Sequence, residues 1–555
     1  MMKPLVSIKN FSASFGQNKV VENISFDIPA KKITAVVGES GSGKSITALS
    51  LIQLLQNTAV LSGEALFSED GVNTIDLLKI NSRQIAQIRG NKISMIFQEP
   101  MTSLNPILNC GTQVSEMILQ HQKISRHAAK EKVLELFSQV ELPEPTSLYK
   151  KYPHEISGGQ KQRVMIAMAL SCNPSLLIAD EPTTALDVRV QKGIINLLKK
   201  LQESHALAIL FISHDLALVK EIADHMVVMQ KGKIVEQGET EQLLSHPQED
   251  YTKALLACRP TPSDKGKKLR TVADFISSKK PDETVKKPVT IDYSQEVLQV
   301  KNLSVIFEKT ASLFRKRQQG FKAVNNVSFS IYNKEIVGLV GESGCGKTSL
   351  GRAILQLLPI SEGEIVLQGR DLSSLKGEAL KTARKDFQIV FQDPFGSLNP
   401  RLSIGNAIGE PIRLYNQGIS RSEVEQRVND ILQRVDLPIS AFSKYPFQFS
   451  GGQRQRICIA RALAVNPSFF VFDESVSALD VSVQAQILNL IQELKSASDF
   501  TALFISHDLG VVHYLCDRIL VMKAGEIVEE GTADEVFFHP KHPYTKELLA
   551  AQPGS

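Results

Sequence analysis

The chain has 555 residues, of which 43% are hydrophobic and 22% charged; this is typical of folded globular protein and excludes a disordered or fibrous chain. The 63 basic and 59 acidic side chains leave a formal net charge of +4, which is too small to predict nucleic acid as a partner. Six cysteines without a C-x-x-C pair indicate neither a disulfide framework nor a zinc site, and favour a reducing compartment. The start lacks an apolar leader, and the apolar runs are shorter than the roughly 20 residues that span a bilayer, so we expect no membrane crossing.

Buried-type strands alternate with helical segments along the first half. Short β-branched runs bounded by glycine or polar residues predict strands, and longer amphipathic runs predict helices. The expected elements are strand Ile33–Val37, helix Ser45–Gln56, helix His127–Val140, helix Gln160–Leu170, strand Leu176–Ala179 and strand Ala208–Ile212. Strands separated by helices predict a mostly parallel sheet, and the helical block before Gln160 predicts a separate helical subdomain.

The second half repeats the first. VVGESGSGKS returns as LVGESGCGKT, IFQEPMTSLNP as VFQDPFGSLNP, ISGGQKQR as FSGGQRQR, and FISHDL unchanged. In both halves 23 residues separate the serine of SGGQ from the aspartate of the acidic strand, and 34 separate that aspartate from the histidine. Helices Ser422–Val435 and Gln453–Leu463 are the second copies of the helical block. A period near 300 residues indicates two whole domains, because solenoid repeats are much shorter.

The boundary between the halves lies in a segment rich in Pro, Ser and Lys with little apolar periodicity, which indicates a flexible linker. We expect a first domain at 1–259, a linker at 260–297 and a second domain at 298–555.

A phosphate-binding loop is the strongest motif in each half. G-x-x-x-x-G-K-[ST] follows an expected strand and opens an expected helix, so backbone N–H groups and the helix N-terminus converge on phosphate. The lysine neutralises the β- and γ-phosphates, and the hydroxyl ligates Mg²⁺. The loop residues are Gly38, Glu39, Ser40, Gly41, Ser42, Gly43, Lys44 and Ser45, then Gly341, Glu342, Ser343, Gly344, Cys345, Gly346, Lys347 and Thr348.

Paired acids and a histidine complete the candidate chemistry. Asp180 and Asp473 end the acidic strands, where a carboxylate holds Mg²⁺ through water. The next residues, Glu181 and Glu474, are placed to polarise the attacking water. The histidines that follow a later strand are candidates to contact the γ-phosphate; they are His214 and His507.

Taken in this order, these motifs resemble the ATP-binding cassette (ABC) ATPases over nearly the whole chain, and SGGQ separates that family from other P-loop NTPases. The resemblance implies an α/β fold of two tandem ABC nucleotide-binding domains. Each has a P-loop RecA-like core, a helical subdomain and an N-terminal antiparallel β portion. It also implies head-to-tail pairing, with each ATP between the P-loop of one half and the signature of the other.

The resemblance assigns further residues to the two expected sites. The Q-loop glutamines, expected to contact Mg²⁺ and water, are Gln98 and Gln392. The signature residues are Ser157, Gly158, Gly159 and Gln160 in the first half and Ser450, Gly451, Gly452 and Gln453 in the second. The D-loop aspartates are Asp187 and Asp480, and the aromatics that match the adenine-stacking position are Phe15 and Phe307. The expected cofactors are ATP and Mg²⁺.

The Q-loop context and the H-P-x-x-x-Y-T-K-x-L-L tails resemble the oligopeptide/dipeptide importer ATPases, with a D-type first half and an F-type second half. The fused layout resembles the Yej-type peptide importer ATPases. Many separate D- and F-type subunits bind an iron–sulfur cluster through a Cys-rich tail, but Cys258 stands alone here, so we expect no cluster. Ser475 replaces the usual Pro after Glu474, which puts the local turn in doubt.

This resemblance implies an ATPase that energises uptake of a peptide, at the cytoplasmic face of the inner membrane as a peripheral protein. The expected partners are two transmembrane permease subunits and an extracytoplasmic solute-binding protein, with no nucleic acid and no homodimer. Nickel, glutathione and peptide antibiotics stay open as cargo. The alternatives are a tandem ABC translation factor acting on ribosomes, disfavoured by Pro281 and Pro288 in the linker, a DNA-repair ATPase and a non-hydrolysing scaffold.

Cys345 lies inside the second phosphate loop. Because the first-turn amides of a helix lower a thiol pKa, we expect Cys345 to be reactive, its alkylation to block the second site, and ATP to protect it.

Overall fold

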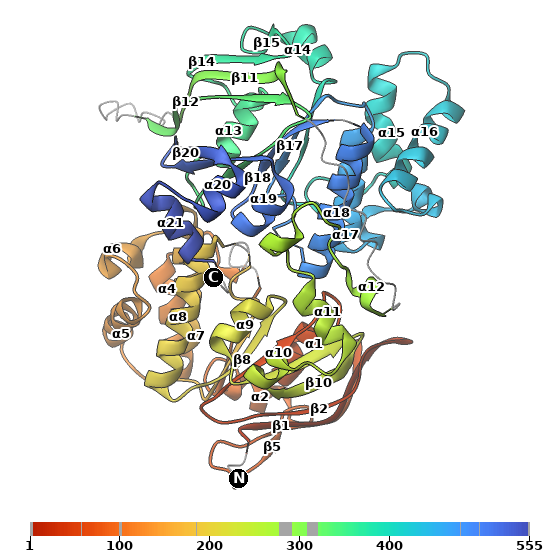
Figure 1. Ribbon diagram of the computed structural model, residues 1–555. Coiled ribbons are helices and arrows are strands. Elements are labelled where there is room, and N and C mark those ends of the chain that lie inside the picture. Colours follow the sequence, from red (N-terminus) through yellow and green to blue (C-terminus); the bar gives the residue numbers. More distant parts are fainter. Residues whose placement is uncertain are drawn as a thin grey trace. The chain divides into compact units, whose positions relative to one another are not determined.

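The computed structural model describes residues 4–56, 58–98, 103–184, 186–276, 291–307, 320–477, 479–498 and 500–552. The chain forms two compact units, which divide between Ala257 and Cys258 (Figure 1). None of the described helices combines the length and the apolar character that crossing a bilayer requires. Much of the expected linker, 277–290, lies outside the described residues.

The first unit opens with an antiparallel sheet in the order β2-β1-β4-β5. Its strands alternate buried and exposed side chains, so that one face packs on the core. They are β1 (Val6–Phe15), β2 (Asn18–Ile28), β4 (Ala59–Phe67) and β5 (Ile75–Asp76), and α2 (Ser82–Ile88) follows them.

A six-stranded sheet in the order β10-β9-β3-β8-β7-β6 forms the centre of the first unit. Strands β6 to β9 run parallel, and β10 pairs antiparallel with β9 at the edge. Strands β3, β7 and β8 are buried along their whole length, which explains their continuous apolar runs. The strands are β3 (Ile33–Val37), β6 (Ile93–Ile96), β7 (Leu176–Asp180), β8 (Ala208–Ser213), β9 (His225–Gln230) and β10 (Lys233–Glu239).

Helices cover this sheet and form a separate subdomain in which α4, α5, α6 and α7 contact one another (Figure 1). The subdomain helices are α4 (Cys110–His121), α5 (Arg126–Gln139), α6 (Pro145–Lys150), η1 (Pro153–Glu155) and α7 (Gly158–Leu170). The other helices are α1 (Lys44–Leu51), α8 (Val188–His205), α9 (Leu216–Ile222), α10 (Thr240–Ser245) and α11 (Asp250–Ala257). One core joins both sheets to α1, with Phe11, Val36, Leu51 and Ile178 among its buried side chains.

The second unit repeats this plan with sheets β12-β11-β14-β15 and β16-β17-β18-β13-β19-β20. Its strands are β11 (Asp292–Phe307), β12 (Phe321–Asn333), β13 (Ile336–Val340), β14 (Glu362–Leu367), β15 (Arg370–Asp371), β16 (Phe387–Val390), β17 (Phe469–Asp473), β18 (Thr501–Ile505), β19 (Arg518–Lys523) and β20 (Glu526–Thr532). Its helices are η2 (Pro262–Asp264), α13 (Lys347–Ile354), α14 (Gly377–Ala383), α15 (Ile404–Tyr415), α16 (Arg421–Arg434), η3 (Ile439–Ser443), η4 (Pro446–Gln448), α17 (Gly451–Leu463), α18 (Val481–Ser498), α19 (Leu509–Leu515), α20 (Ala533–Phe538) and α21 (Pro543–Ala550). A short helix, α12 (Val272–Ile276), precedes β11. The expected core, helical subdomain and N-terminal antiparallel sheet are thus confirmed in both units.

One expected boundary is wrong. Helix α1 ends at Leu51, five residues before the predicted end at Gln56. Gln53 takes a left-handed conformation, and its side-chain amide donates to two main-chain carbonyls. The Arg89 guanidinium donates to the carbonyls of Ile52 and Gln53 at 2.5 and 2.6 Å. The main-chain carbonyls at the end of α1 therefore accept hydrogen bonds from Arg89 and not from a further helical turn.

The described start of the expected linker has defined contacts with the second unit. The Asn489 side chain on α18 donates to the carbonyl of Leu269 and accepts from its N–H, both at 2.9 Å. The Tyr514 hydroxyl on α19 donates to the carbonyl of Lys267 at 2.8 Å, and Lys265 pairs with Asp534 at 2.9 Å. Polar side chains of α18 to α20 therefore hold this segment against the unit.

Candidate functional site

The glycine-rich loop between β3 and α1 has the same backbone shape as the loop between β13 and α13. Gly43 and Gly346 have φ of 99° and 110° immediately before the helix, in the left-handed region that favours glycine. A Cβ on Gly38 would lie 2.1 Å from the carbonyl oxygen of Met229, and the equivalent approach in the second unit is 2.2 Å. The loops must therefore be glycine at these points to lie against the sheet.

A buried lysine fills each loop. The Lys44 ammonium lies 2.7 Å from the carbonyl oxygen of Gly38 and 2.9 Å from that of Glu39, and Lys347 repeats both distances. Lys44 is 5% exposed and Lys347 is 4% exposed. A buried ammonium whose hydrogen bonds go to neutral carbonyls is a strong binding group for an entering anion.

The aspartate that ends each acidic strand contacts a hydroxyl side chain in the first turn of the helix that follows the phosphate loop. The Ser45 hydroxyl donates to Oδ1 of Asp180 at 3.1 Å, and the Thr348 hydroxyl donates to Oδ1 of Asp473 at the same distance. This contact joins the P-loop to the end of β7 or β17, as the motif order predicts.

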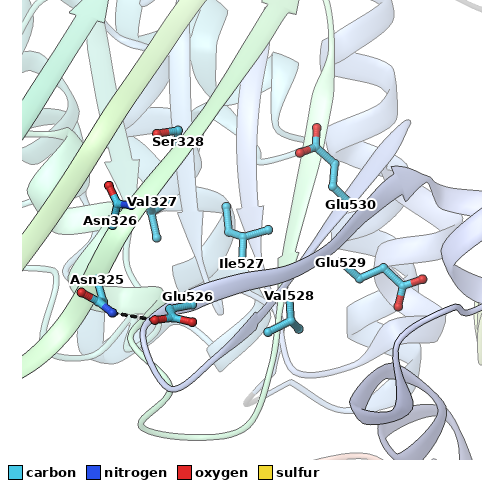
Figure 2. A pocket seen from close by; sticks show the side chains of 9 residues that line it. All are labelled: Asn325, Asn326, Val327, Ser328, Glu526, Ile527, Val528, Glu529 and Glu530. Atoms are coloured by element: carbon cyan, nitrogen blue, oxygen red, sulfur yellow. Dashed lines mark hydrogen bonds between the residues drawn. The ribbon is translucent and has the colours of Figure 1, made fainter.

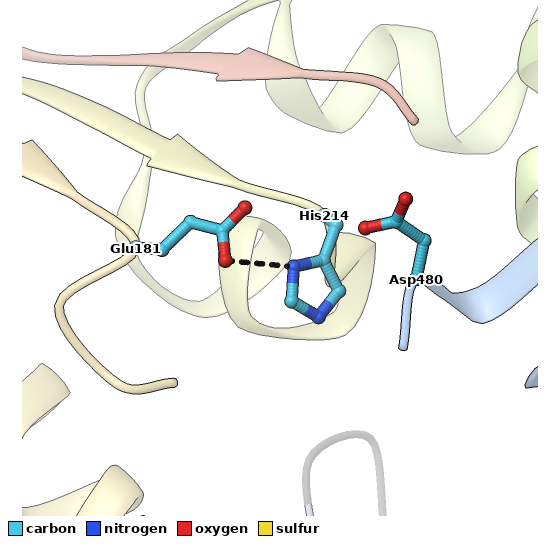
Figure 3. A group of neighbouring side chains, drawn as sticks. All are labelled: Glu181, His214 and Asp480. Atoms are coloured by element: carbon cyan, nitrogen blue, oxygen red, sulfur yellow. Dashed lines mark ion pairs between the residues drawn. The ribbon is translucent and has the colours of Figure 1, made fainter. Parts of the chain in front are cut away.

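In each unit the predicted glutamine and histidine side chains lie beside the glutamate. Oε2 of Glu181 lies 3.1 Å from Nε2 of Gln98. The same oxygen lies 3.3 Å from Nδ1 of His214 (Figure 3). In the second unit Oε2 of Glu474 lies 2.8 Å from Nε2 of Gln392 and 3.8 Å from Nδ1 of His507. The structure therefore brings glutamate, glutamine and histidine together in each unit.

Ser475 does not alter the turn that the sequence put in doubt. Glu181 and Glu474 both have φ of 46°, although Pro follows the first and Ser475 the second. A non-glycine residue in this conformation carries backbone strain, which is common at reactive positions. Ser475 is 2% exposed, and Pro182 at the equivalent position is also buried.

Neighbouring carboxylates in each unit have opposite pKa shifts. Burial raises the pKa of Asp180 to about 6, against the hydrogen bond from Ser45. Burial also tends to raise the pKa of Glu181. The contact with His214 and the hydrogen bond from Thr184 outweigh burial, however, and lower this pKa to about 2. The pKa of Asp473 is likewise raised and that of Glu474 lowered. The glutamates are therefore ionised at neutral pH and can accept a hydrogen bond from water.

The donor set fits a magnesium ion. Mg²⁺ prefers oxygen ligands, and the paired hydroxyl and carboxylate oxygens of Ser45 and Asp180, or of Thr348 and Asp473, supply them. Gln98 and Gln392 turn their amide nitrogens toward the glutamates, so their predicted metal contact needs a turn of the side chain. The raised pKa of Asp180 is consistent with a buried carboxylate placed beside a cation site.

The SGGQ residues begin a helix in each unit. Ser157 and Gln160 cap α7 reciprocally, and Ser450 and Gln453 cap α17 in the same way. Ser157 and Ser450 are exposed, so each helix N-terminus is open to solvent within its own unit. Gly159 and Gly452 allow close packing, because a Cβ there would lie 2.7 and 2.2 Å from a valine of the next helix.

The other predicted residues lie at element ends. Phe15 ends β1 and is partly buried, and Phe307 ends β11 and is 44% exposed. Asp187 is buried and caps α8 through the N–H of Val190 at 2.9 Å. Asp480 is buried before α18. An accessible aromatic ring at Phe307 suits stacking on a base; Phe15 is less accessible.

Matches to known protein families identify the family to which the chain belongs. The model described as "ABC transporter" matches residues 21–184 and 324–477, and "Oligopeptide/dipeptide transporter, C-terminal region" matches 235–281 and 528–554. The chain is an ABC transporter ATPase. The predicted family, the two cassette domains and the ATPase activity are confirmed.

The chain is 43% identical over 560 residues to "Glutathione import ATP-binding protein GsiA" of Pectobacterium atrosepticum, covering 99% of this chain and 90% of the relative. It is 43% identical over 559 residues to the protein of the same name from Escherichia coli strain K12, covering 99% of this chain and 89% of the relative. A solved dimeric ATP-binding cassette, MJ0796 bound to ADP and Pi, is 28% identical and covers 42% of this chain and 98% of its own, with a TM-score of 0.38.

A pocket of about 520 Å³ in the second cassette is distinct from the ATP-binding motifs (Figure 2). It lies between β12 and β20, and Glu526, Glu529 and Glu530 are among its lining residues. Three carboxylates disfavour a polyanionic nucleotide, and the lining contains no residue of the phosphate loop.

Sequence reasoning missed three side chains of the cassettes. The Thr184 hydroxyl donates to Oε2 of Glu181 at 2.9 Å. The Tyr251 and Tyr544 hydroxyls each accept the N–H of the second loop residue, Glu39 or Glu342, at 3.0 Å. Thr184 follows Glu181 by three residues and the tyrosines lie inside the Y-T-K tails, but spacing alone did not predict these contacts.

The expected lowering of the Cys345 thiol pKa is wrong, whereas its alkylation and protection by ATP stay predictions. Burial raises the pKa of its thiol, and the charge of Lys347 offsets this only in part. The side chain is 7% exposed and packs under Gly341. The effect of burial on the thiol pKa is larger than that of the helix N-terminus, because the thiol is buried in the protein core.

Proposed function

We propose that this ATPase energises the uptake of peptides, or of a related small solute, through separate membrane subunits. The observation that carries the proposal is that both cassettes keep the full catalytic set and both end in the oligopeptide/dipeptide transporter C-terminal region. The relatives named for glutathione import favour a short peptide such as glutathione as the cargo.

The proposed hydrolytic roles follow from the geometry within each cassette. The Lys44 ammonium exchanges its carbonyl partners for the β- and γ-phosphates of ATP. Glu181 is ionised and accepts a hydrogen bond from the attacking water, which Gln98 helps to orient. His214, beside Glu181, is placed to contact the γ-phosphate. Ser45 and Asp180 would hold Mg²⁺, which when bound would supply positive charge to the phosphate oxygens.

The second site has the same proposed roles for Lys347, Thr348, Gln392, Asp473, Glu474 and His507. In this proposal the SGGQ residues and the D-loop aspartate of the opposite half complete each ATP-binding site. The adenine stacks on Phe15 or Phe307. ATP binding closes the halves, and hydrolysis with release of phosphate reopens them.

An exposed aromatic group beside the second Q-loop supports docking of a membrane subunit. Phe395 follows Gln392 by three residues and is 62% exposed, and the Arg454 guanidinium lies 3.9 Å from its ring centroid. Phe447 is 69% exposed and stacks on Tyr445 at 6.0 Å. Arg454 links the two aromatics because its Nε donates to the carbonyl of Pro446 at 2.7 Å. Exposed apolar groups of this kind mark interaction surfaces.

The decisive experiment for partners is isolation of the tagged chain in mild detergent with identification of the bound proteins. Two polytopic membrane proteins and a solute-binding protein support the importer at the cytoplasmic face of the inner membrane. Ribosomal proteins without membrane subunits overturn it in favour of a translation factor. The pair Phe395→Ser and Phe447→Ser tests the docking surface, because it should release the membrane subunits and leave basal ATPase activity in place.

The two-site claim is tested by Glu181→Gln and Glu474→Gln, assayed singly. Each should reduce ATPase and transport strongly, because each removes an ionised acceptor for water. If either change leaves both activities intact, the cassette that carries it is not a hydrolytic site.

A further inference from the structure

The tail of each cassette reaches back to its own phosphate loop. Tyr251 on α11 accepts the N–H of Glu39 at 3.0 Å, and Tyr544 on α21 accepts the N–H of Glu342 at 3.0 Å. Tyr251 is 4% exposed and Tyr544 is 2% exposed. The same contact therefore occurs twice, between segments that lie about 200 residues apart in the chain.

A glutamate on the edge strand seats the start of each tail helix. Glu529 on β20 accepts the N–H of Lys541 at 2.7 Å and that of His542 at 3.0 Å, just before α21. Burial tends to raise the pKa of Glu529, but the hydrogen bonds that it accepts from these amides oppose burial and its pKa is lowered, so it is an anion at neutral pH.

Glu236 on β10 takes the same role in the first cassette. It accepts the N–H of Gln248 at 2.8 Å and that of Glu249 at 3.4 Å, just before α11. In both cassettes the edge strand therefore fixes the tail helix from which the tyrosine extends.

The peptide unit between Gly38 and Glu39 is held at both ends. Its carbonyl accepts from the Lys44 ammonium at 2.7 Å, and its N–H donates to the Tyr251 hydroxyl at 3.0 Å. In the second cassette Lys347 and Tyr544 hold the equivalent peptide at the same two distances. When the lysine turns to the phosphates of a nucleotide, the tyrosine is the contact that keeps this peptide in place.

We propose that Tyr251 and Tyr544 are positioning residues of the two phosphate loops, through which the C-terminal tail sets the affinity of each cassette for nucleotide. The inference rests on the proposed nucleotide sites. A loop held in its binding shape does not have to be ordered when the phosphates enter, so the contact favours binding rather than the chemical step.

The experiment replaces both tyrosines in the full chain, Tyr251→Phe and Tyr544→Phe, which keeps the rings and removes the hydroxyls. The equilibrium Kd for a fluorescent ATP analogue and the steady-state KM and kcat are measured. One neutral hydrogen bond at each loop predicts a Kd and KM raised about threefold to tenfold, with kcat changed less than twofold.

Tyr514→Phe is the matched control. It removes another buried tyrosine hydroxyl that contacts a main-chain carbonyl of the second unit, at Lys267, away from the phosphate loop. It should lower the melting temperature without changing the Kd. Glu529→Ala provides a second route, because it frees the tail helix and should raise the Kd in the same direction while Tyr544 is intact.

A raised Kd and KM with retained kcat, absent from the control, supports the inference. An unchanged Kd in the double variant, or an equal change in Tyr514→Phe, overturns it. Lys44→Ala with Lys347→Ala separates the two levels of the argument. If these lysine changes leave the Kd unchanged, the proposed nucleotide sites are themselves wrong, whereas a loss restricted to the lysine variants refutes only the role of the tyrosines.

Discussion

The Thr184 hydroxyl donates to Oε2 of Glu181 at 2.9 Å, whereas its counterpart Ser477 donates to the main-chain oxygen of Glu474 at 2.8 Å. The two cassettes therefore hold their glutamates differently, although every residue of the predicted catalytic set occurs in both. Glu474 instead lies 3.8 Å from the Lys347 ammonium. The proposed catalytic carboxylate of the first cassette, Glu181, thus accepts from a side-chain hydroxyl that has no equivalent at Glu474.

This difference predicts that Thr184→Val slows the first site. Valine keeps the shape of threonine and removes the donor, so the Glu181 carboxylate becomes freer and its pKa rises. Hydrogen bonds to charged groups contribute about 1.5–3 kcal/mol, so we expect kcat to fall about tenfold and activity to be lost at a higher pH on acidification. The measurement is the pH profile of ATPase activity in a Glu474→Gln background, which reports the first site alone.

Ser477→Ala in a Glu181→Gln background is the matched control. Because the Ser477 hydroxyl contacts the main chain and not the carboxylate, its loss should shift neither kcat nor the pH profile of the second site by more than about twofold. Equal losses in the two variants would show that the threonine acts through the fold and not through the carboxylate.

Cys345 should react slowly with alkylating reagents. The thiolate is the reactive form, and burial both raises the thiol pKa and excludes the reagent. We expect a labelling rate at least tenfold below that of a small free thiol at pH 7.5, measured by mass spectrometry of the loop peptide. Cys345→Ser should keep its ATPase activity, because Ser42 has the equivalent position in the first cassette. Fast labelling that ATP prevents would instead show that the Cys345 thiol is reactive and lies in the nucleotide site.

The motifs predicted which side chains meet, because local patterns fix where buried strands end. Asp180, Glu181 and His214 all follow the carboxyl ends of parallel strands, and a parallel sheet brings these ends to one edge. The same reasoning placed strand β3 at its observed bounds. It failed for the end of α1, where the guanidinium of Arg89 decides the boundary from a distant segment.

Contacts between distant segments explain what the sequence did not reveal at the site. Tyr251 is part of a recognisable tail motif, but only the folded chain brings its hydroxyl to the N–H of Glu39. Cys345 shows the opposite error, because its place in the motif indicated a helix N-terminus while burial determines its pKa. The bounds 1–259, 260–297 and 298–555 stay a prediction.

Asn489 should hold the segment before α12 on the second unit. Its side-chain amide satisfies both main-chain groups of Leu269, which is 2% exposed. Asn489→Ala leaves a buried N–H and carbonyl without this partner, which costs about 2–4 kcal/mol. We expect trypsin to cleave after Lys267 and Lys268 at least tenfold faster in the variant. Ser496→Ala, on the exposed end of the same helix, should leave the cleavage rate unchanged, and equal rates in all three proteins would contradict the anchoring role.

His513 should make the second unit less stable as the pH falls below about 6.5. Burial lowers its pKa from the ordinary 6.5, against the hydrogen bond that Nε2 donates to Asp534 at 2.8 Å. Below pH 6.5 the unfolded chain therefore binds a proton that the folded chain does not, and the free energy of unfolding decreases. Above that pH both states are neutral and this contribution is complete.

His513→Phe tests this directly, because phenylalanine keeps a ring against Phe537 and Phe538 but cannot bind a proton. Urea unfolding of the full chain at pH 7.5 and pH 5.5 gives the difference in stability between the two conditions. That difference should shrink in His513→Phe and stay the same in His205→Asn, which changes an exposed histidine of the first unit. Asp534 does not produce the same effect, because its pKa is lowered by Lys265 and its contribution is lost only near and below pH 3.8. An unchanged difference in His513→Phe would assign the acid sensitivity to other groups.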